Sequence, residues 1–132
     1  MAITKSAAVS LNGNSVGSGN SVSAGTPYTG PWVDLTGAYA AQLSLQITNG
    51  GTGPTVAAQI QIQTANDYNS GSPASTIANY GGPLQSATGN SVVTNWSIDL
   101  EGMAVAAVRV VVSGNTGQAV TFQGDLCKVT AI

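Results

Sequence analysis

Histidine is absent from this chain of 132 residues, and cysteine occurs only once, at Cys127. Without histidine the chain lacks the commonest general base, the Ser-His and Cys-His nucleophile pairs and most zinc sites. A single cysteine excludes an intrachain disulfide, and because Cys127 lies in an alternating strand pattern we expect a buried, unreactive thiol. We therefore predict a protein that is not an enzyme, with no catalytic residues, no cofactor and no metal site.

Charge is scarce as well. Charged residues make up 6% of the chain, against roughly 25% in an average soluble domain. Lys5, Arg109 and Lys128 are the only basic residues, too few for a nucleic-acid site, which needs several phosphate contacts. No apolar run approaches the ~20 residues of a membrane span, and the N-terminal stretch shows no apolar region typical of a secretory signal. We expect neither nucleic acid nor membrane as a partner.

Serine, threonine, asparagine, glutamine and 17 glycines take the place of the missing charges. Such a surface forms hydrogen bonds but has little long-range repulsion to keep molecules apart. Two interpretations are open: an uncharged but solvated surface, or a surface covered by neighbours in an ordered array. We favour the second, because low net charge promotes association.

A helical period is also missing, and period-two alternation takes its place. Apolar and polar residues alternate in Gln42–Thr48, Ala58–Thr64 and Val92–Leu100, as in strands with one buried and one polar face. Further strand patterns lie at Val108–Val112, Val120–Phe122 and Leu126–Ile132, and we expect a bulge or bend at Gly124. Residues 1–132 are predicted to form one all-β domain, an antiparallel, jelly-roll-like β-sandwich.

The sequence contains two similar halves. Trp32–Gly37 resembles Trp96–Gly102 with one residue inserted, and an alanine-containing stretch follows each. A strand pattern comes next in both halves, at Leu43–Thr48 and at Val108–Ser113, and a turn and another strand follow. We expect the two halves to face each other in the sandwich.

Two regions lie outside this repeat. Residues 1–25 are a possible N-terminal arm followed by a flexible loop, and the arm could pair with its own sheet or with a neighbour's edge through Val9 and Leu11. Residues 65–90 form a long connecting loop, and loops of this length are usually functional or disordered. Its two tyrosines stand beside asparagines, so the candidate protein-contact residues here are Tyr68, Asn69, Asn79 and Tyr80.

Aromatic and acidic residues leave alternatives open. Trp96 is in phase with Ile98 and is expected to pack in the core, whereas Trp32, with Tyr28, could form a platform on which sugars stack. Asp34 and Asp99 occupy matching places in the two halves. We expect both to accept backbone hydrogen bonds in the turns that follow, although paired acids could in principle serve a glycosidase.

The whole chain resembles the small Gly/Ser/Thr/Asn-rich β-proteins of tailed double-stranded DNA bacteriophage virions, above all capsid cement or decoration proteins with a jelly-roll core. The resemblance rests on the start MAITKSAAVS, the few charges, the Trp-x-Asp-Leu-x-Gly strand end and a strand pattern that reaches the last residue. It implies a structural protein of the capsid surface, made in the host cytoplasm, that forms a dimer or trimer and bridges major capsid protein subunits. A phage tail or fibre component and a carbohydrate-binding jelly-roll module remain as alternatives.

Overall fold

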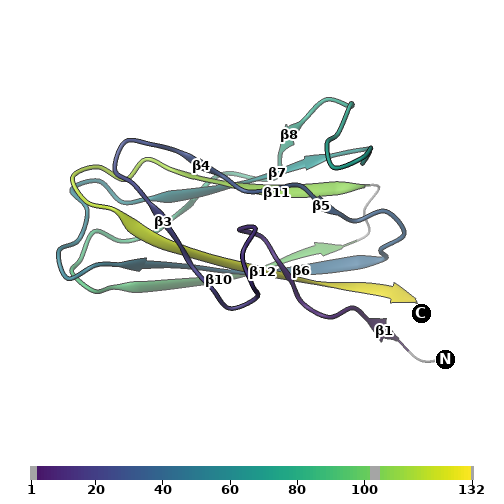
Figure 1. Cartoon of the computed structure of the whole chain (residues 1–132), viewed down its shortest axis with the longest axis horizontal. Helices are drawn as coiled ribbons and strands as arrows, with labels where there is room; N and C mark the ends of the chain where they lie inside the picture. Colours follow the sequence, from purple (N-terminus) through teal and green to yellow (C-terminus); the bar gives the residue numbers. More distant parts are fainter. Residues whose placement is uncertain (1–2, 102–104, 132) are drawn as a thin grey trace.

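The computed structural model, which describes residues 3–101 and 105–131, has two antiparallel sheets facing each other across a hydrophobic core (Figure 1). The described residues contain no helix. The strands are β1 (Thr4–Lys5), β2 (Val9–Ser10), β3 (Asn20–Val22), β4 (Tyr28–Thr29), β5 (Val33–Asp34), β6 (Ala40–Asn49), β7 (Gln59–Ala65), β8 (Ala78–Asn79), β9 (Leu84–Gln85), β10 (Val93–Glu101), β11 (Ala107–Ser113) and β12 (Val120–Ala131). The predicted antiparallel β-sandwich is confirmed.

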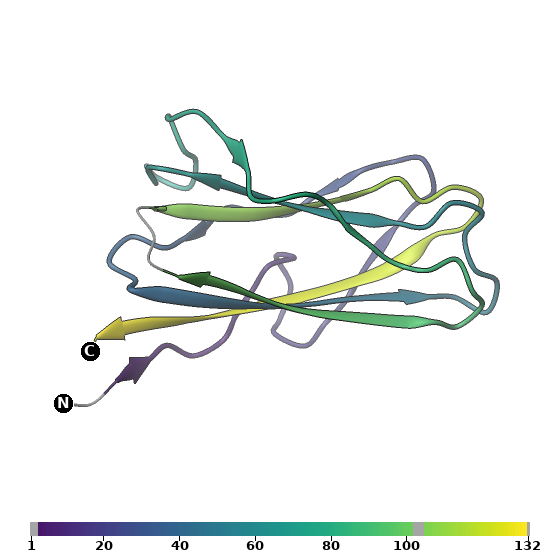
Figure 2. The same ribbon diagram turned by 180° about the vertical axis from the view of Figure 1, so that it is seen from behind.

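Each sheet is built from long strands with short strands along its margins. Sheet A has the order β12–β6–β10, and β1, β2 and β3 pair one after another with the outer side of β12. In sheet B, β7 and β11 are neighbours. The short strands β8 and β9 pair with the outer side of β7, and β4 and β5 pair with the outer side of β11. Figure 2 shows the connection from β8 to β10, which crosses from sheet B to sheet A.

The two halves of the sequence exchange their strands between the sheets. β5, β6 and β7 of the first half correspond to β10, β11 and β12 of the second. In sheet A, β6 lies between β10 and β12, and in sheet B, β11 lies between β5 and β7. Each central strand therefore takes its neighbours from the other half. The expectation that the two halves face each other is wrong, because each half contributes strands to both sheets.

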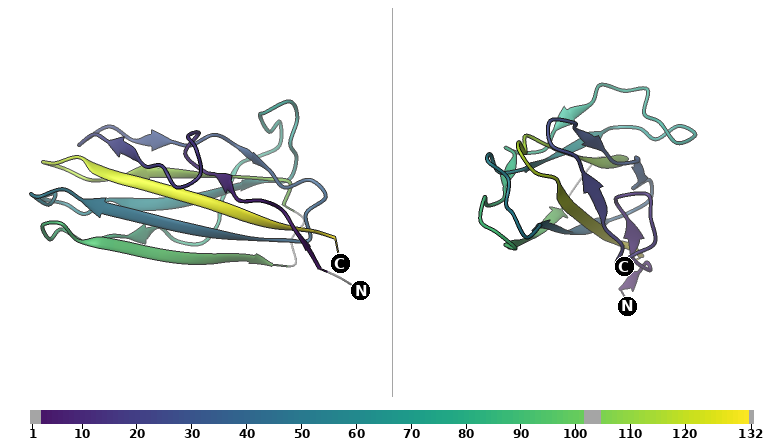
Figure 3. Two further views of the ribbon diagram at one scale, coloured as in Figure 1. Left: turned by 60° about the horizontal axis from the view of Figure 1, so that its bottom comes forward. Right: turned by 60° about the vertical axis from the view of Figure 1, so that its left-hand side comes forward.

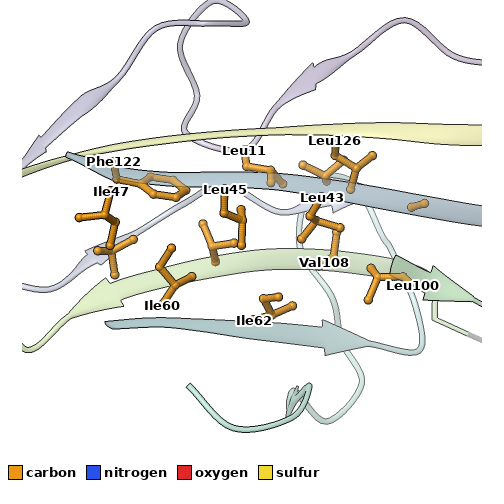
Figure 4. Close-up of a cluster of buried hydrophobic side chains, with 14 of the residues drawn as sticks. Leu11, Leu43, Leu45, Ile47, Ile60, Ile62, Leu100, Val108, Phe122 and Leu126 are labelled. Carbon is orange, nitrogen blue, oxygen red and sulfur yellow. The ribbon is translucent and has the colours of Figure 1, made fainter. Parts of the chain in front are cut away.

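The core is filled by the apolar side chains of the alternating patterns (Figure 4). Burial of each such side chain stabilises the fold by about 1.5–3 kcal/mol, because its apolar surface leaves water. Trp96 and Ile98 of β10 are only partly buried but pack against the same cluster, as their phase predicts. The fully buried side chains include Leu11, Leu43, Leu45, Ile47, Ile60, Val108, Val110, Leu100, Phe122 and Leu126.

Two expectations about the last strand are wrong. β12 has no bulge at Gly124, because its register with β6 is unbroken. Gly124 faces the core, where a Cβ atom would lie 2.6 Å from the ring of Phe122, so the missing side chain makes room for that ring. Cys127 is exposed rather than buried. It alternates with the buried Leu126, which places it on the outer face of the sheet.

The N-terminal segment lies along its own sheet (Figure 3). Val9 pairs with Leu126 of β12, and Leu11 is completely buried in the core. The predicted flexible loop contains a short strand, β3, which also pairs with β12. Asn12 is buried beneath it, and its side-chain amide donates to the carbonyl of Ser18 at 2.6 Å. Buried asparagine bonding thus orders a stretch whose composition alone is typical of a loop.

Candidate protein-contact surfaces

The outer face of sheet A carries mostly uncharged polar side chains in rows across three strands, together with the carboxylates of Asp99 and Asp125. We call this surface face A; it consists of the outward-facing described side chains of β6, β10 and β12. One row joins Asn95, Gln46 and Gln123, and the next joins Ser97, Ser44 and Asp125. Gln46 donates to the Oδ1 of Asn95 at 2.9 Å. Such cross-strand amide bonds favour one arrangement of the side chains they join.

Small residues hollow the middle of face A. Ser44 and Ser97 lie opposite each other there, and their short side chains leave a shallow depression of ≈ 410 Å³. Amide, hydroxyl and carboxylate groups surround it, so it can offer both donors and acceptors to a polar surface that settles on it. The lining residues are Ser44, Leu45, Gln46, Asn95, Trp96, Ser97, Gln123 and Asp125.

The outer face of sheet B carries a second row. Register places Arg109 of β11 opposite Gln63 of β7, and Gln63 opposite Asn79 of β8. The guanidinium Nε of Arg109 donates to Gln63 at 2.9 Å, and Gln63 donates to Asn79 at 3.3 Å. At the other end of the row, the guanidinium carbon of Arg109 lies 4.5 Å from the ring centre of Trp32, a cation–π contact. A sugar stacking on that face of Trp32 would have to displace Arg109.

Tyr28 does not share this surface with Trp32. It pairs with Val112, packs against the core and lies 6.3 Å, ring centre to ring centre, from Phe122. Its hydroxyl donates to the carbonyl of Asn12 at 2.8 Å. Burial raises the pKa of Tyr28 above its ordinary value, an effect that the nearby Asn20 side chain partly offsets. The structure therefore does not bring the two candidate sugar-stacking residues into one platform.

The long connection between β7 and β10 begins with a loop that Asp67 holds together. Its carboxylate accepts the backbone N–H groups of Ala74 and Ser75 at 2.9 and 2.8 Å. The hydrogen bond with the Ser75 side chain, followed by these backbone bonds, lowers the pKa of Asp67. Tyr68 is half-buried in this loop and Asn69 is exposed at its tip, where it bridges to Ser72.

The other two contact candidates of this connection lie next to sheet B. Asn79 belongs to β8 and ends the Arg109 row. Tyr80 follows it and is 39% exposed, near the exposed Ile77. The Tyr80 hydroxyl donates to the backbone carbonyl of Asp99 on β10, at 3.3 Å. The four candidates of this region thus divide between a loop tip (Tyr68 and Asn69) and a surface running from sheet B to the edge of sheet A (Asn79 and Tyr80).

The two matching aspartates have different roles. Asp34 accepts the N–H of Thr36 at 2.8 Å, the turn bond expected from the sequence. Hydrogen bonding by Thr36, and to a lesser degree the charge of Lys128, holds the pKa of Asp34 below its ordinary value. Asp99 lies on face A, where it accepts the side chain of Gln42 at 3.0 Å, and the turn expected after it lies outside the described residues. The side chain of Glu101, the other acid close to Asp99 in sequence, is outside the described set.

No known family model matches this chain, and no curated protein is significantly similar to it in sequence. Within residues 3–101 and 105–131, no group of three or more histidine, cysteine, aspartate or glutamate side chains is placed to hold a metal ion. The same residues include no apolar helix long enough to cross a membrane.

Sequence reasoning missed the row formed by Trp32, Arg109, Gln63 and Asn79. Its members lie far apart in the chain and meet only through strand register. The sequence predicts which side chains of β7 are polar and face outward. It does not predict which strands pair with β7.

Proposed function

We propose that this protein is a non-enzymatic virion structural protein of the capsid cement or decoration type. It associates with copies of itself and bridges major capsid protein subunits on the capsid surface of a tailed bacteriophage. The observation that supports this proposal most directly is face A, where the side-chain hydrogen bonds Gln46–Asn95 and Gln42–Asp99 join β6 and β10. The outward side chains described on its three strands include no lysine or arginine.

A surface of this kind suits repeated docking on a shell. Its side chains are already ordered, so contact with a partner costs less conformational entropy than contact by free long side chains. With few charges, many copies can lie close together without strong repulsion. Many modest contacts on one particle add up through avidity, so each individual interface can be weak.

The test uses expanded capsids assembled from the major capsid protein of the same phage. Purified protein is expected to cosediment with these shells and to raise their disruption temperature. Gln123→Lys places a charge beside the depression of face A, on β12 and therefore one strand removed from β10. This variant is expected to abolish binding. Thr29→Lys adds the same charge to exposed β4 of sheet B and is expected to leave binding intact.

The outcome also separates the capsid from the tail. Protein that does not bind shells but assembles into rings or tubes contradicts the cement proposal and favours a tail component. Equal loss of binding in Gln123→Lys and Thr29→Lys contradicts the role of face A.

A further inference from the structure

Among the described residues, the outer side of β10 presents backbone groups with which no other strand pairs. The N–H of Asn49 donates to the carbonyl of Val92 at 2.9 Å, so residue 92 is turned toward β6. Backbone direction alternates along an antiparallel strand, so residues 94, 96 and 98 also face β6 while residues 93, 95, 97 and 99 face outward. The bond from Tyr80 to the outward carbonyl of Asp99 agrees with this assignment.

This edge lacks several of the usual features that prevent pairing, although it carries Asp99 and Glu101 and the Tyr80 hydroxyl contacts one of its carbonyls. Natural edge strands are kept short, bulged, or broken by proline or lysine. β10 has nine residues in unbroken register with β6 and contains neither proline nor lysine. Among the described strands, none pairs with its outer side. The other three sheet margins are made of strands of two or three residues.

We propose that this edge pairs with β10 of a second copy, antiparallel, about a two-fold axis that passes by Ser97. The two sheets A then form one continuous sheet, and face A extends across both copies. This inference rests on the self-association in the proposed function and gives it an interface.

The sequence of β10 complements itself in this register. On face A, Ser97 lies opposite the second copy's Ser97, and Asn95 lies opposite the second copy's Asp99. An amide donor then meets a carboxylate, as Gln42 already meets Asp99 within the sheet. On the inner side, Trp96 lies opposite the second copy's Ile98, an aromatic and β-branched pair of the kind that stabilises neighbouring strands. Both side chains are only half-buried in the single chain, so pairing completes their burial.

The expected dimer is weak in free solution. A single pair of strands covers less than the roughly 800 Å² per partner of a standard interface. Tyr80 also competes for the carbonyl of Asp99 at one end of the edge. We therefore expect the dimer fraction to rise steadily with protein concentration. On a shell, neighbouring copies are held close together, and this high local concentration favours the dimer.

The first test is sedimentation velocity over a concentration series without capsids. Ser97→Lys sets two lysines against each other at the two-fold axis and is expected to weaken dimerisation at least tenfold. Thr121→Lys is the matched control, since it adds the same charge to face A on β12. Mixing Ser97→Lys with Ser97→Asp is expected to restore dimers, because residue 97 meets itself only in this register. A monomer up to millimolar concentration, or a dimer that Ser97→Lys leaves unchanged, overturns the proposal.

The second test traps the pair covalently in a Cys127→Ser background. Opposed residues that exchange both hydrogen bonds have Cα atoms about 5.5 Å apart, within the range of a disulfide. With oxidised glutathione, Ser97→Cys is expected to give a disulfide dimer on a non-reducing gel, and Thr121→Cys is expected to stay monomeric. Equal crosslinking of both overturns the register. Cosedimentation with capsids is measured separately, so a dimer that ignores shells contradicts the proposed function and leaves this interface standing.

Discussion

The margin formed by β4 and β5 and the margin formed by β10 differ sharply, although β5 and β10 are equivalent in the two halves of the sequence. The first margin consists of two strands of two residues each, and the second is one strand of nine residues. Each margin contains a tryptophan, and the two tryptophans lie in different surroundings. Trp32 lies beneath Arg109 on the outer side of sheet B. Trp96 packs against the core from sheet A.

The break between β4 and β5 has a visible cause. Gly30 and Pro31 separate the two strands, and Pro31 has no N–H to donate to a partner. At Gly30 a Cβ atom would lie 2.5 Å from the carbonyl of Leu11, so the N-terminal segment passes too close for a side chain. β10 has no such interruption. One half of the repeated pattern therefore ends its sheet in two short, interrupted strands, and the other half ends its sheet in one long, uninterrupted strand.

The largest expected effect comes from proline at two adjacent positions of β10. Ile98→Pro removes an N–H that faces β6, together with a ladder bond, and is expected to cost about 3 kcal/mol or more of unfolding free energy. Ser97→Pro removes an N–H that faces outward and is expected to cost less, because proline is tolerated on the open side of an edge strand. Urea unfolding of the two variants measures the difference. Equal losses would contradict the backbone direction assigned to this strand.

The next effect compares the two tryptophans. Trp96→Ala is expected to cost about 3 kcal/mol, near the lower end for a large aromatic in contact with a core, since Trp96 is only partly buried. Trp32→Ala is expected to cost about 1 kcal/mol, mainly through loss of the contact with Arg109. Thermal and urea denaturation under identical conditions provide the two values. A larger loss at Trp32 would reverse the contrast between the two margins.

Acid pH tests the margin formed by β4 and β5 through Asp34 of β5. Its pKa in the folded chain is lowered, below about 3.9 in the unfolded chain. A lowered folded-state pKa contributes stability that is present above the unfolded value and lost as pH falls through the folded value. Asp34→Asn is therefore expected to flatten the loss of stability as pH falls below about 4. Unfolding midpoints across this range check it, and an unchanged pH profile would count against the Thr36 bonding.

The smallest expected effect comes from Tyr80→Phe. The variant removes one hydroxyl, which donates at 3.3 Å to a carbonyl on the open edge. The unfolding free energy is expected to change by less than about 1 kcal/mol, because water can take over as donor. The dimer fraction is expected to rise modestly, since the carbonyl of Asp99 becomes free to pair. A fall in dimerisation would show that Tyr80 supports the edge instead of competing for it.

Much of the fold was predictable, because alternation identifies strands directly. Leu43, Leu45 and Ile47 were placed on one buried face from their spacing, and all three are buried. Cys127 is exposed, against expectation, because it shares its phase with the polar Gln123 and Asp125 and not with the buried Phe122 and Leu126. Gly124 was misread because glycine in a strand pattern is typical of a bulge, and no local signal shows that Phe122 needs the space.

The sequence alone does not show what surrounds each candidate contact residue. From its place near the N-terminus, Leu11 is predicted to belong to an arm. It is buried in the core because β2 and β3 pair along β12. Tyr80 is a candidate contact residue because it is an aromatic residue in a long loop. Its hydrogen bond to the carbonyl of Asp99 on β10 depends on how that loop crosses between the sheets. Trp32 and Tyr28 are four positions apart, yet one contacts Arg109 and the other contacts Phe122.

By itself the sequence determined that this chain folds into two half-buried sheets, that its two halves share a pattern, and that its surface carries few charges. These properties depend on the order and kind of side chains along the chain. Only the tertiary structure decided which sheet margins consist of short strands and which one is formed by a long strand. Strand order and register bring together residues distant in sequence, and the pairing partner of a strand is not encoded in its own alternation.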